Sequence, residues 1–215
     1  MAVDVKICGI NSETALEAAV EGGAKYVGFI FFPPSPRFVF AEAAADLARR
    51  VPPSAGVTRV GVFVDPSIEE LDNTLLHVPL DMIQLHGHES PEEVEAIRYT
   101  FRLPVMKAIG ISTASDFEQM AEYASVADRL LFDAKPPKGA ALPGGNAIAF
   151  DWTLMAGVKS PLPWTLSGGL DASNLAEAVR LSSATAVDVS SGVERSPGRK
   201  DPALIKAFLD AARRL

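Results

Sequence analysis

The chain has 215 residues, of which 48% are hydrophobic and 22% charged, so it can bury a substantial core and is not intrinsically disordered. Its net charge of −7 argues against nucleic acid or an anionic membrane as the main partner. A single cysteine, Cys8, excludes a disulfide framework and a cysteine-rich zinc site. No run reaches the ~18–20 apolar residues of a membrane span, and the N-terminus lacks the pattern of a signal peptide. We therefore expect a cytoplasmic protein folded as one domain over residues 1–215.

Short apolar runs, rich in Val, Ile and Phe and bounded by Gly, Pro, Asp or Ser, recur along the whole chain. This composition is typical of buried parallel strands. The expected strands are Asp4 to Cys8, Tyr26 to Phe31, Thr58 to Val64, Met82 to Leu85, Pro104 to Ile109, Arg129 to Phe132, Trp164 to Ser167 and Ala186 to Ser190.

Amphipathic segments with helix-start signals lie between these runs. Ser12, Ser67, Ser90 and Thr113 each precede one and fit the N-cap position, and Pro91 fits the first turn of its helix. A further helix is expected in the C-terminal segment that begins at Asp201, because its start is acidic and its end is basic.

The alternation of strands and helices predicts an α/β fold with a parallel sheet. Eight units in 215 residues average about 27 residues each, which favours a closed (β/α)8 TIM barrel. An open flavodoxin-like sheet is the alternative, but it would leave some of the eight strands unexplained. The long irregular stretch 135–149 is expected to be a lid or binding loop.

Polar groups follow nearly every predicted strand, which is where a barrel builds its active site. The two clearest are the glycine-rich turns with Gly168 and Gly169 after the seventh strand and with Ser190, Ser191 and Gly192 after the eighth. Such turns expose backbone N–H groups that hold a phosphate. A single turn of this kind can simply connect a strand to a helix, but two in adjacent units favour phosphate binding.

Cys8 ends the first strand, and Lys6 lies on the same strand face. The ammonium would favour the thiolate, the form that acts as a base or nucleophile. Alternatively, Cys8 is a buried apolar thiol.

Asp133 follows the buried sixth strand, so it is expected to be paired with Lys135 or Lys107, or else to be functional. His86, after the fourth strand, is expected to be a hydrogen-bonded rim residue with at most a supporting role. The three histidines lack the spacing of metal ligands, so no metal is expected.

Together the motifs KICGI, GFIFFPPSPRFV, GVFVD, IQLHG, LLFDAK, FDW, LSGGL and DVSSGVE, in this order, resemble the phosphoribosylanthranilate isomerase family over almost the whole chain. The resemblance implies an Amadori rearrangement of N-(5′-phosphoribosyl)anthranilate in tryptophan biosynthesis. It implies Cys8 as general base, Asp133 as general acid and Arg37 as the contact for the anthranilate carboxylate. Gly168, Gly169, Asp188, Ser190, Ser191 and Gly192 would bind the substrate, with Lys6 and His86 in support.

The chain departs from the family in the segment GGNAIAFDW, where Asn146 and Ala147 stand in place of the residues that are common in the family. The resemblance therefore does not extend to how the predicted lid closes. The chemistry needs one acid and one base, so we expect no cofactor. The expected partner is a small phosphorylated substrate, and the assembly is a monomer or a homodimer.

Other hypotheses about the function fit the sequence less well. A ribulose-phosphate epimerase would need paired metal ligands, and an indole-glycerol-phosphate synthase would need more catalytic lysines and glutamates. A non-catalytic metabolite-binding barrel would lack the acid or the base, and a thiol-redox protein would need a second cysteine. Whether the chain also isomerises the related ribotide of histidine biosynthesis stays open.

Overall fold

The computed structural model describes residues 3–135, 144 and 149–215. Eight parallel strands close into a barrel in which each strand pairs with the next along the chain and the last pairs with the first. The strands are β1 (Asp4–Cys8), β2 (Tyr26–Ile30), β3 (Thr58–Phe63), β4 (Met82–Leu85), β5 (Val105–Ile111), β6 (Arg129–Ala134), β7 (Trp164–Leu166) and β8 (Ala186–Val189). The predicted (β/α)8 barrel is confirmed.

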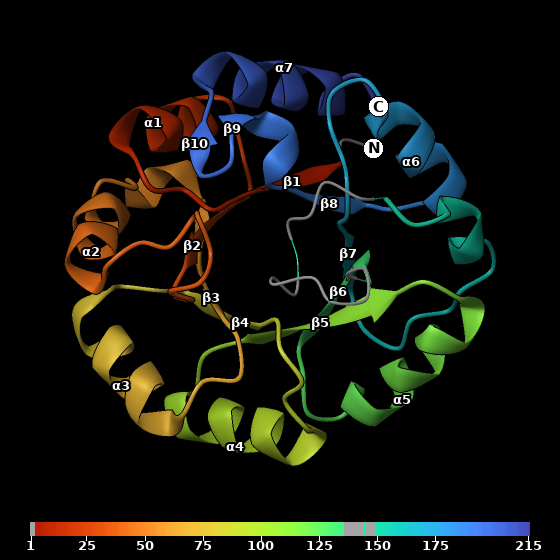
Figure 1. Ribbon diagram of the computed structural model, residues 1–215, viewed down its shortest axis with the longest axis horizontal. Helices are drawn as coiled ribbons and strands as arrows, with labels where there is room; N and C mark the ends of the chain where they lie inside the picture. The colour runs from red at the N-terminus through yellow and green to blue at the C-terminus, as the bar shows by residue number, and fades with distance from the viewer. Residues whose placement is uncertain (1–2, 136–143, 145–148) are drawn as a thin grey trace.

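Helices surround the barrel, as Figure 1 shows in a view along its axis. They are α1 (Glu13–Glu21), α2 (Ala41–Arg49), α3 (Ile68–His77), α4 (Pro91–Phe101), α5 (Met120–Tyr123), α6 (Leu175–Ser182) and α7 (Pro202–Ala212). Short 3₁₀ turns lie at η1 (Pro53–Ala55), η2 (Ala114–Gln119), η3 (Trp152–Met155) and η4 (Ser191–Val193). Figure 1 also shows α7 beside α1, so the last helix completes the ring next to the first.

Alternation along each strand divides the apolar residues into two layers, because successive side chains point to opposite faces. One layer fills the space between the strands and the helices. The other lies inside the barrel and consists of Cys8, Tyr26, Val60, Val62, Met82, Met106, Ala108 and Leu131. Polar residues two positions along the same strands from members of this inner layer therefore also point inward. They lie beyond the layer, at the carboxyl ends of the strands.

Several expected helix starts are present in the structure. Ser67 and Ser90 form capping boxes with Glu70 and Glu93, and Asp201 accepts a hydrogen bond from the backbone N–H of Ala203. These local bonds satisfy backbone donors that the first turn of a helix leaves unpaired. Ser12 precedes α1 as expected, but its side chain makes no capping hydrogen bond.

The structure differs from the sequence prediction in several places. The segment after Thr113 forms a 3₁₀ turn before the four-residue helix α5, rather than one long helix. Asp133 lies within β6, in register with Gly110, rather than just after it, because the strand continues to Ala134. The sequence analysis also missed a two-stranded hairpin of β9 (Glu194–Ser196) and β10 (Arg199–Lys200), whose strands are too short for a pattern.

None of the helices among the described residues is long and apolar enough to cross a membrane. Residues 1–2, 136–143 and 145–148, which contain most of the predicted lid with Asn146 and Ala147, lie outside the described residues.

Candidate active site

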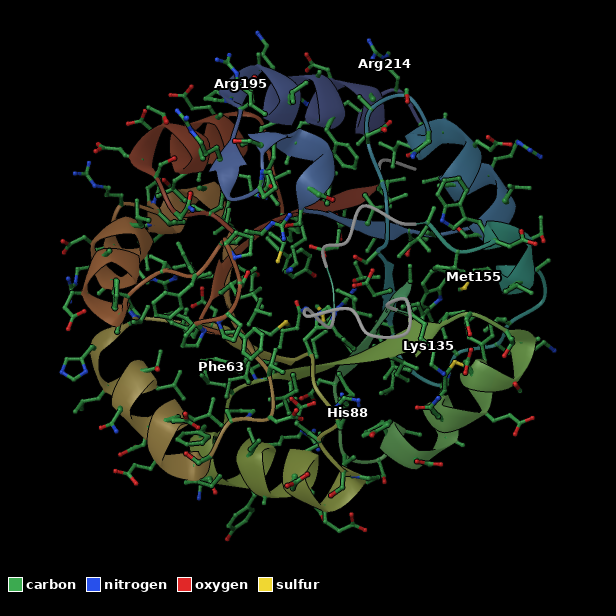
Figure 2. The ribbon with its side chains drawn as sticks, viewed as in Figure 1. Phe63, His88, Lys135, Met155, Arg195 and Arg214 are labelled. Carbon is green, nitrogen blue, oxygen red and sulfur yellow. The ribbon has the colours of Figure 1, made fainter. Side chains whose placement is uncertain are left out.

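A pocket lies at the carboxyl ends of the barrel strands, the place where a (β/α)8 barrel builds its active site. Figure 2 shows the side chains of the described residues in the same view along the barrel. Residues from the strand ends and the following loops line the pocket. Among them are the predicted site residues Cys8, Arg37, His86, Asp133, Gly168, Gly169, Asp188, Ser190 and Ser191.

Lys6, Cys8 and Asp188 form the wall made by β1 and β8. Lys6 and Asp188 are in register on these neighbouring strands, and the Lys6 ammonium lies 2.8 Å from Asp188 Oδ1. Ser167 donates a hydrogen bond of 3.2 Å to the other oxygen of Asp188. Asp188 therefore holds Lys6 directly beneath the thiol, because Lys6 and Cys8 are two residues apart on the inner strand face.

Burial raises the pKa of the Cys8 thiol, because the deprotonated form loses its hydration. Lys6 and Lys200 lower this pKa and Asp188 raises it, and the pKa stays above its ordinary value. The prediction that Lys6 favours the thiolate identified a real contribution, but burial outweighs it. Burial alone would lower the pKa of Lys6, yet Asp188 and Cys8 raise it, so Lys6 is a permanent cation.

Gly28 on β2 lies opposite Cys8 in the barrel register. A Cβ at this position would lie 3.0 Å from Cys8 Sγ and 3.2 Å from Lys6 Nζ. The sequence analysis missed this residue, although a glycine inside a strand often marks a close approach of another group. Its missing side chain makes the room in which Lys6 and the thiol lie.

Asp133 occupies the opposite wall of the pocket, on β6. Its Oδ2 lies 3.2 Å from His86 Nε2, and its Oδ1 accepts a hydrogen bond of 2.9 Å from the backbone N–H of Ala134. Gln84, on β4, lies 2.9 Å from His86 Nδ1 and so orients the ring. His86 is thus a hydrogen-bonded rim residue, as expected, and its partner is the predicted acid.

The pairing of Asp133 with Lys135 or Lys107 was expected as an alternative and is wrong. Lys107 makes a buried ion pair of 2.8 Å with Glu89, and Lys135 lies 3.2 Å from Asp116. Both ammonium groups are thus held by other carboxylates, and Asp133, on the inner face of β6, lines the pocket.

The glycine-rich turn after β7 forms one end of the pocket. Gly168 and Gly169 have φ values of +90° and +61°, a conformation that favours glycine. A Cβ on Gly168 would lie 2.8 Å from the backbone nitrogen of Ala134 and 3.1 Å from Asp133 Oδ1. The turn therefore passes directly over the end of β6.

The turn after β8 contributes Ser190 and Ser191 to the pocket lining, whereas Gly192 is not among the lining residues. A Cβ on Gly192 would lie 1.9 Å from the carbonyl oxygen of Leu170, so this glycine allows the two adjacent turns to pack together. Gly192 therefore contributes to the packing of the turn and not to the pocket lining.

Arg37 follows β2 and is 4% exposed. Its guanidinium donates two hydrogen bonds to Glu194, from Nε at 2.8 Å and from Nη2 at 2.9 Å. Lys200 Nζ lies 2.7 Å from the same carboxylate. The sequence analysis assigned no role to Glu194 or Lys200, because the hairpin that carries both was not expected.

The described residues contain no group of three or more His, Cys, Asp or Glu side chains that could hold a metal ion. What the pocket does present is a thiol on one wall, a carboxyl group on the other, a cationic side and two turns with backbone N–H groups. This arrangement can move protons on a small anionic molecule.

Comparison with known proteins agrees with this geometry. A family model described as N-(5'phosphoribosyl)anthranilate (PRA) isomerase matches residues 5–211. The chain is 59% identical over 213 residues to the N-(5'-phosphoribosyl)anthranilate isomerase of Paramagnetospirillum magneticum, with 99% of this chain and 98% of the relative covered. It is 60% identical over 213 residues to the same enzyme of Rhodospirillum centenum, with 99% of each chain covered.

Solved structures show the same relationship. The phosphoribosyl anthranilate isomerase of Thermotoga maritima superimposes with a TM-score of 0.88 at 38% identity, covering 99% of this chain and 100% of that one. A phosphoribosyl anthranilate isomerase in complex with reduced 1-(o-carboxyphenylamino)-1-deoxyribulose 5-phosphate gives a TM-score of 0.85 at 37% identity, with 99% and 100% covered. The chain belongs to the N-(5′-phosphoribosyl)anthranilate isomerase family.

Proposed function

We propose that a single barrel domain carries out the Amadori rearrangement of N-(5′-phosphoribosyl)anthranilate, with Cys8 as general base and Asp133 as general acid. The observation that carries these roles is the placement of the two groups on β1 and β6, three strands apart around the ring. Both are buried, and both line the same pocket. A ribose between them can receive a proton on one side and lose one on the other.

The reaction follows from these two groups. Asp133 gives a proton to the furanose oxygen as the ring opens, and the anthranilate nitrogen supplies the electron pair that forms the iminium. Cys8 removes the proton from C2′, which gives an enolamine that tautomerises to the ketone. Only protons move, and the number of electrons is unchanged, so the step is an aldose–ketose isomerisation.

Two further contacts would orient the substrate. Backbone N–H groups of the turns at Gly168–Gly169 and Ser190–Ser191 suit the phosphate, because such turns are anion-binding sites. Arg37 suits the anthranilate carboxylate, because a guanidinium binds a carboxylate through two parallel hydrogen bonds. Binding energy from these ends of the molecule then fixes the reacting carbons between Cys8 and Asp133.

His86 would support the acid through its contact with Asp133, and Lys6 and Asp188 would support the base from below. The enzyme would act on this small phosphorylated substrate in the cytoplasm, in tryptophan biosynthesis. One related structure is described as monomers of the dimeric Thermotoga maritima enzyme. We propose a monomer or a homodimer for this chain as well.

The experiment that tests the catalytic roles compares Cys8→Ser and Asp133→Asn with the unchanged protein. A general acid or base contributes roughly a hundred- to ten-thousand-fold to the rate, so kcat should fall by that amount in each variant. The dissociation constant for the reduced product analogue should change little. The fluorescence of the substrate, followed as it is consumed, measures the rate.

The matched control is Asp65→Asn, which neutralises a carboxylate that is not among the pocket-lining residues. Its side chain is about half exposed, and we expect kcat to stay within a factor of two of the unchanged protein. Near-normal turnover in either Cys8→Ser or Asp133→Asn would overturn the corresponding role.

A further inference from the structure

Glu194 is a buried carboxylate that the proposed reaction does not use. It begins the hairpin β9–β10, and its side chain is only 2% exposed. Arg37 donates hydrogen bonds to this carboxylate through Nε and Nη2, and Lys200 donates one through Nζ at 2.7 Å. The backbone N–H of Gly198 donates a further one at 3.3 Å. Because burying a charge is costly unless it is paired, this carboxylate is committed to these donors.

The hairpin is docked onto the loop that carries Arg37. A Cβ on Gly198, at the hairpin tip, would lie 2.1 Å from the carbonyl oxygen of Pro36. The side chain of Asn11, from the loop after β1, donates a hydrogen bond of 2.9 Å to the carbonyl of Gly198. On the other side, a Cβ on Gly9 would lie 3.0 Å from Cδ of Arg37, so the aliphatic stem is enclosed as well. The position of Glu194 relative to Arg37 is therefore set by backbone packing.

Lys200 connects the same carboxylate to the turn after β8. Its ammonium donates to the carbonyl oxygen of Ser190 at 2.8 Å and to the hydroxyl at 3.2 Å, and its side chain is fully buried. Burial lowers the pKa of Lys200, although Glu194 opposes this effect. Burial would raise the pKa of Glu194, but Arg37 and Lys200 more than offset it and hold the carboxylate ionised.

The charges of this group have a consequence for ligand binding. With Glu194 ionised and both Arg37 and Lys200 protonated, the three side chains carry one net positive charge. If Glu194 were paired with Arg37 alone, its negative charge would cancel the attraction of the guanidinium for an anionic ligand. The positive charge of Lys200 restores this attraction. Glu194 bonds one edge of the planar guanidinium, through Nε and Nη2, which fixes the direction of the plane at the pocket wall.

We propose that Glu194 is a positioning residue that selects the carboxylate-bearing substrate, by fixing the Arg37 guanidinium in the plane that receives the anthranilate carboxylate while Lys200 keeps the group cationic. This inference rests on the proposed role of Arg37. Glu194 touches neither the substrate nor the reacting atoms. It lowers the cost of binding, because a long side chain that is already held in one orientation loses less freedom when the ligand arrives.

The test measures dissociation constants for two ligands, reduced 1-(o-carboxyphenylamino)-1-deoxyribulose 5-phosphate and the same compound made from aniline, which lacks the carboxylate. The unchanged protein should bind the first at least about tenfold more tightly, as a charge-assisted hydrogen-bonded pair requires. Glu194→Gln should reduce this preference about tenfold, with the aniline compound bound as before. In kinetics, KM for the true substrate should rise while kcat stays within about threefold.

The matched control is Arg195→Gln, one residue further along the hairpin. Arg195 lies at the outer edge of the molecule in Figure 2, and its side chain is 76% exposed. This variant should keep the preference. In a background with Arg37→Ala, Glu194→Gln should change the preference no further, because the effect passes through Arg37.

Each outcome decides between the readings. If Arg37→Ala abolishes the preference but Glu194→Gln keeps it, Glu194 is not a positioning residue and the proposed function stands. If the unchanged protein itself shows no preference, the proposed role of Arg37 in binding the carboxylate is overturned, and the inference that rests on it with it. Equal weakening of both ligands by Glu194→Gln would mean a merely structural role and would overturn the inference.

Glu194→Asp keeps the test decisive if Glu194→Gln does not fold. This variant retains the charge but shortens the side chain by one methylene, so the carboxylate withdraws from the guanidinium. We expect folded protein with a reduced preference for the carboxylate-bearing ligand. Full preference in Glu194→Asp would overturn the inference.

Discussion

At the scale of single residues, the surroundings of Cys8 balance opposing effects on one thiol. Burial raises its pKa, and the ammonium of Lys6 directly below lowers it. Asp188 and Lys200 act in opposite directions from the neighbouring strand and the hairpin. A base that needs its proton removed before it can act therefore depends on Lys6, whose charge is secured by the ion pair with Asp188.

The dependence of kcat/KM on pH tests this balance. The raised pKa of Cys8 places the rising limb of the profile above the ordinary thiol range near pH ~8.5, because activity grows as the thiol loses its proton. Lys6→Gln removes a group that lowers the pKa, so the limb should move to still higher pH and kcat/KM at pH 7 should fall. Lys25→Gln, an exposed lysine just before β2, is the control and should leave the profile in place. An unmoved limb in Lys6→Gln would show that Cys8 is not the titrating base.

At the scale of elements, the turns after β7 and β8 shape the end of the pocket. The turn after β7 brings Gly168 against Asp133 and Ala134, and the turn after β8 packs Gly192 against Leu170. These contacts require residues without side chains, so the two turns act as one unit at the end of the pocket. Gly169, with φ of +61°, presents its backbone to the pocket from the same unit.

The phosphate site is tested by Gly169→Ala. A Cβ there should block the approach of an anion to the backbone, and the left-handed conformation adds a cost of about 1–2 kcal/mol in folding stability. We expect the inhibition constant of inorganic phosphate to rise about tenfold, the loss of about one hydrogen bond to a charged group. Gly157→Ala separates the two effects, since Gly157 has φ of +80° with nothing within 4 Å of an added Cβ. It should lose similar stability and bind phosphate normally. Equal phosphate binding by both variants would place the site elsewhere.

At the scale of the whole molecule, closure of the barrel depends on the pairing of β1 with β8 and on α7, which packs against α1, α6 and β1. Phe208 and Leu209 on the inner face of α7 are 0% and 2% exposed. A Cβ on Gly22, at the end of α1, would lie 2.3 Å from Cδ1 of Leu209. The first and last helices are thus in close contact, so the ends of the chain stabilise each other.

Phe208→Ala should lower the free energy of unfolding by about 3–5 kcal/mol, because it removes a buried aromatic ring and leaves a cavity. Leu204→Ala on the same helix is the control, since Leu204 is 39% exposed, and the loss should stay below about 1 kcal/mol. Urea unfolding followed by circular dichroism measures both. Similar small losses in the two variants would mean that α7 contributes little to closure.

The sequence by itself determined the barrel and the rim on which its site lies. Alternation along a strand and the direction of parallel strands are local properties, so Lys6 and Cys8 could be assigned to one strand face, and Asp133 to the carboxyl end of its strand, before any contact was known. The capping boxes at Ser67 and Ser90 were equally readable, because each involves residues only three positions apart.

The tertiary structure alone decided which charged groups meet. Asp133 contacts His86 rather than a lysine, and Arg37 is held by Glu194, 157 residues away in the chain. Such partners depend on how far each strand is staggered around the ring and on where a short hairpin folds back, and no pattern within one segment encodes either. The balance of burial and charge at Cys8 is decided in the same way, because the desolvation of a thiol is set by everything packed around it.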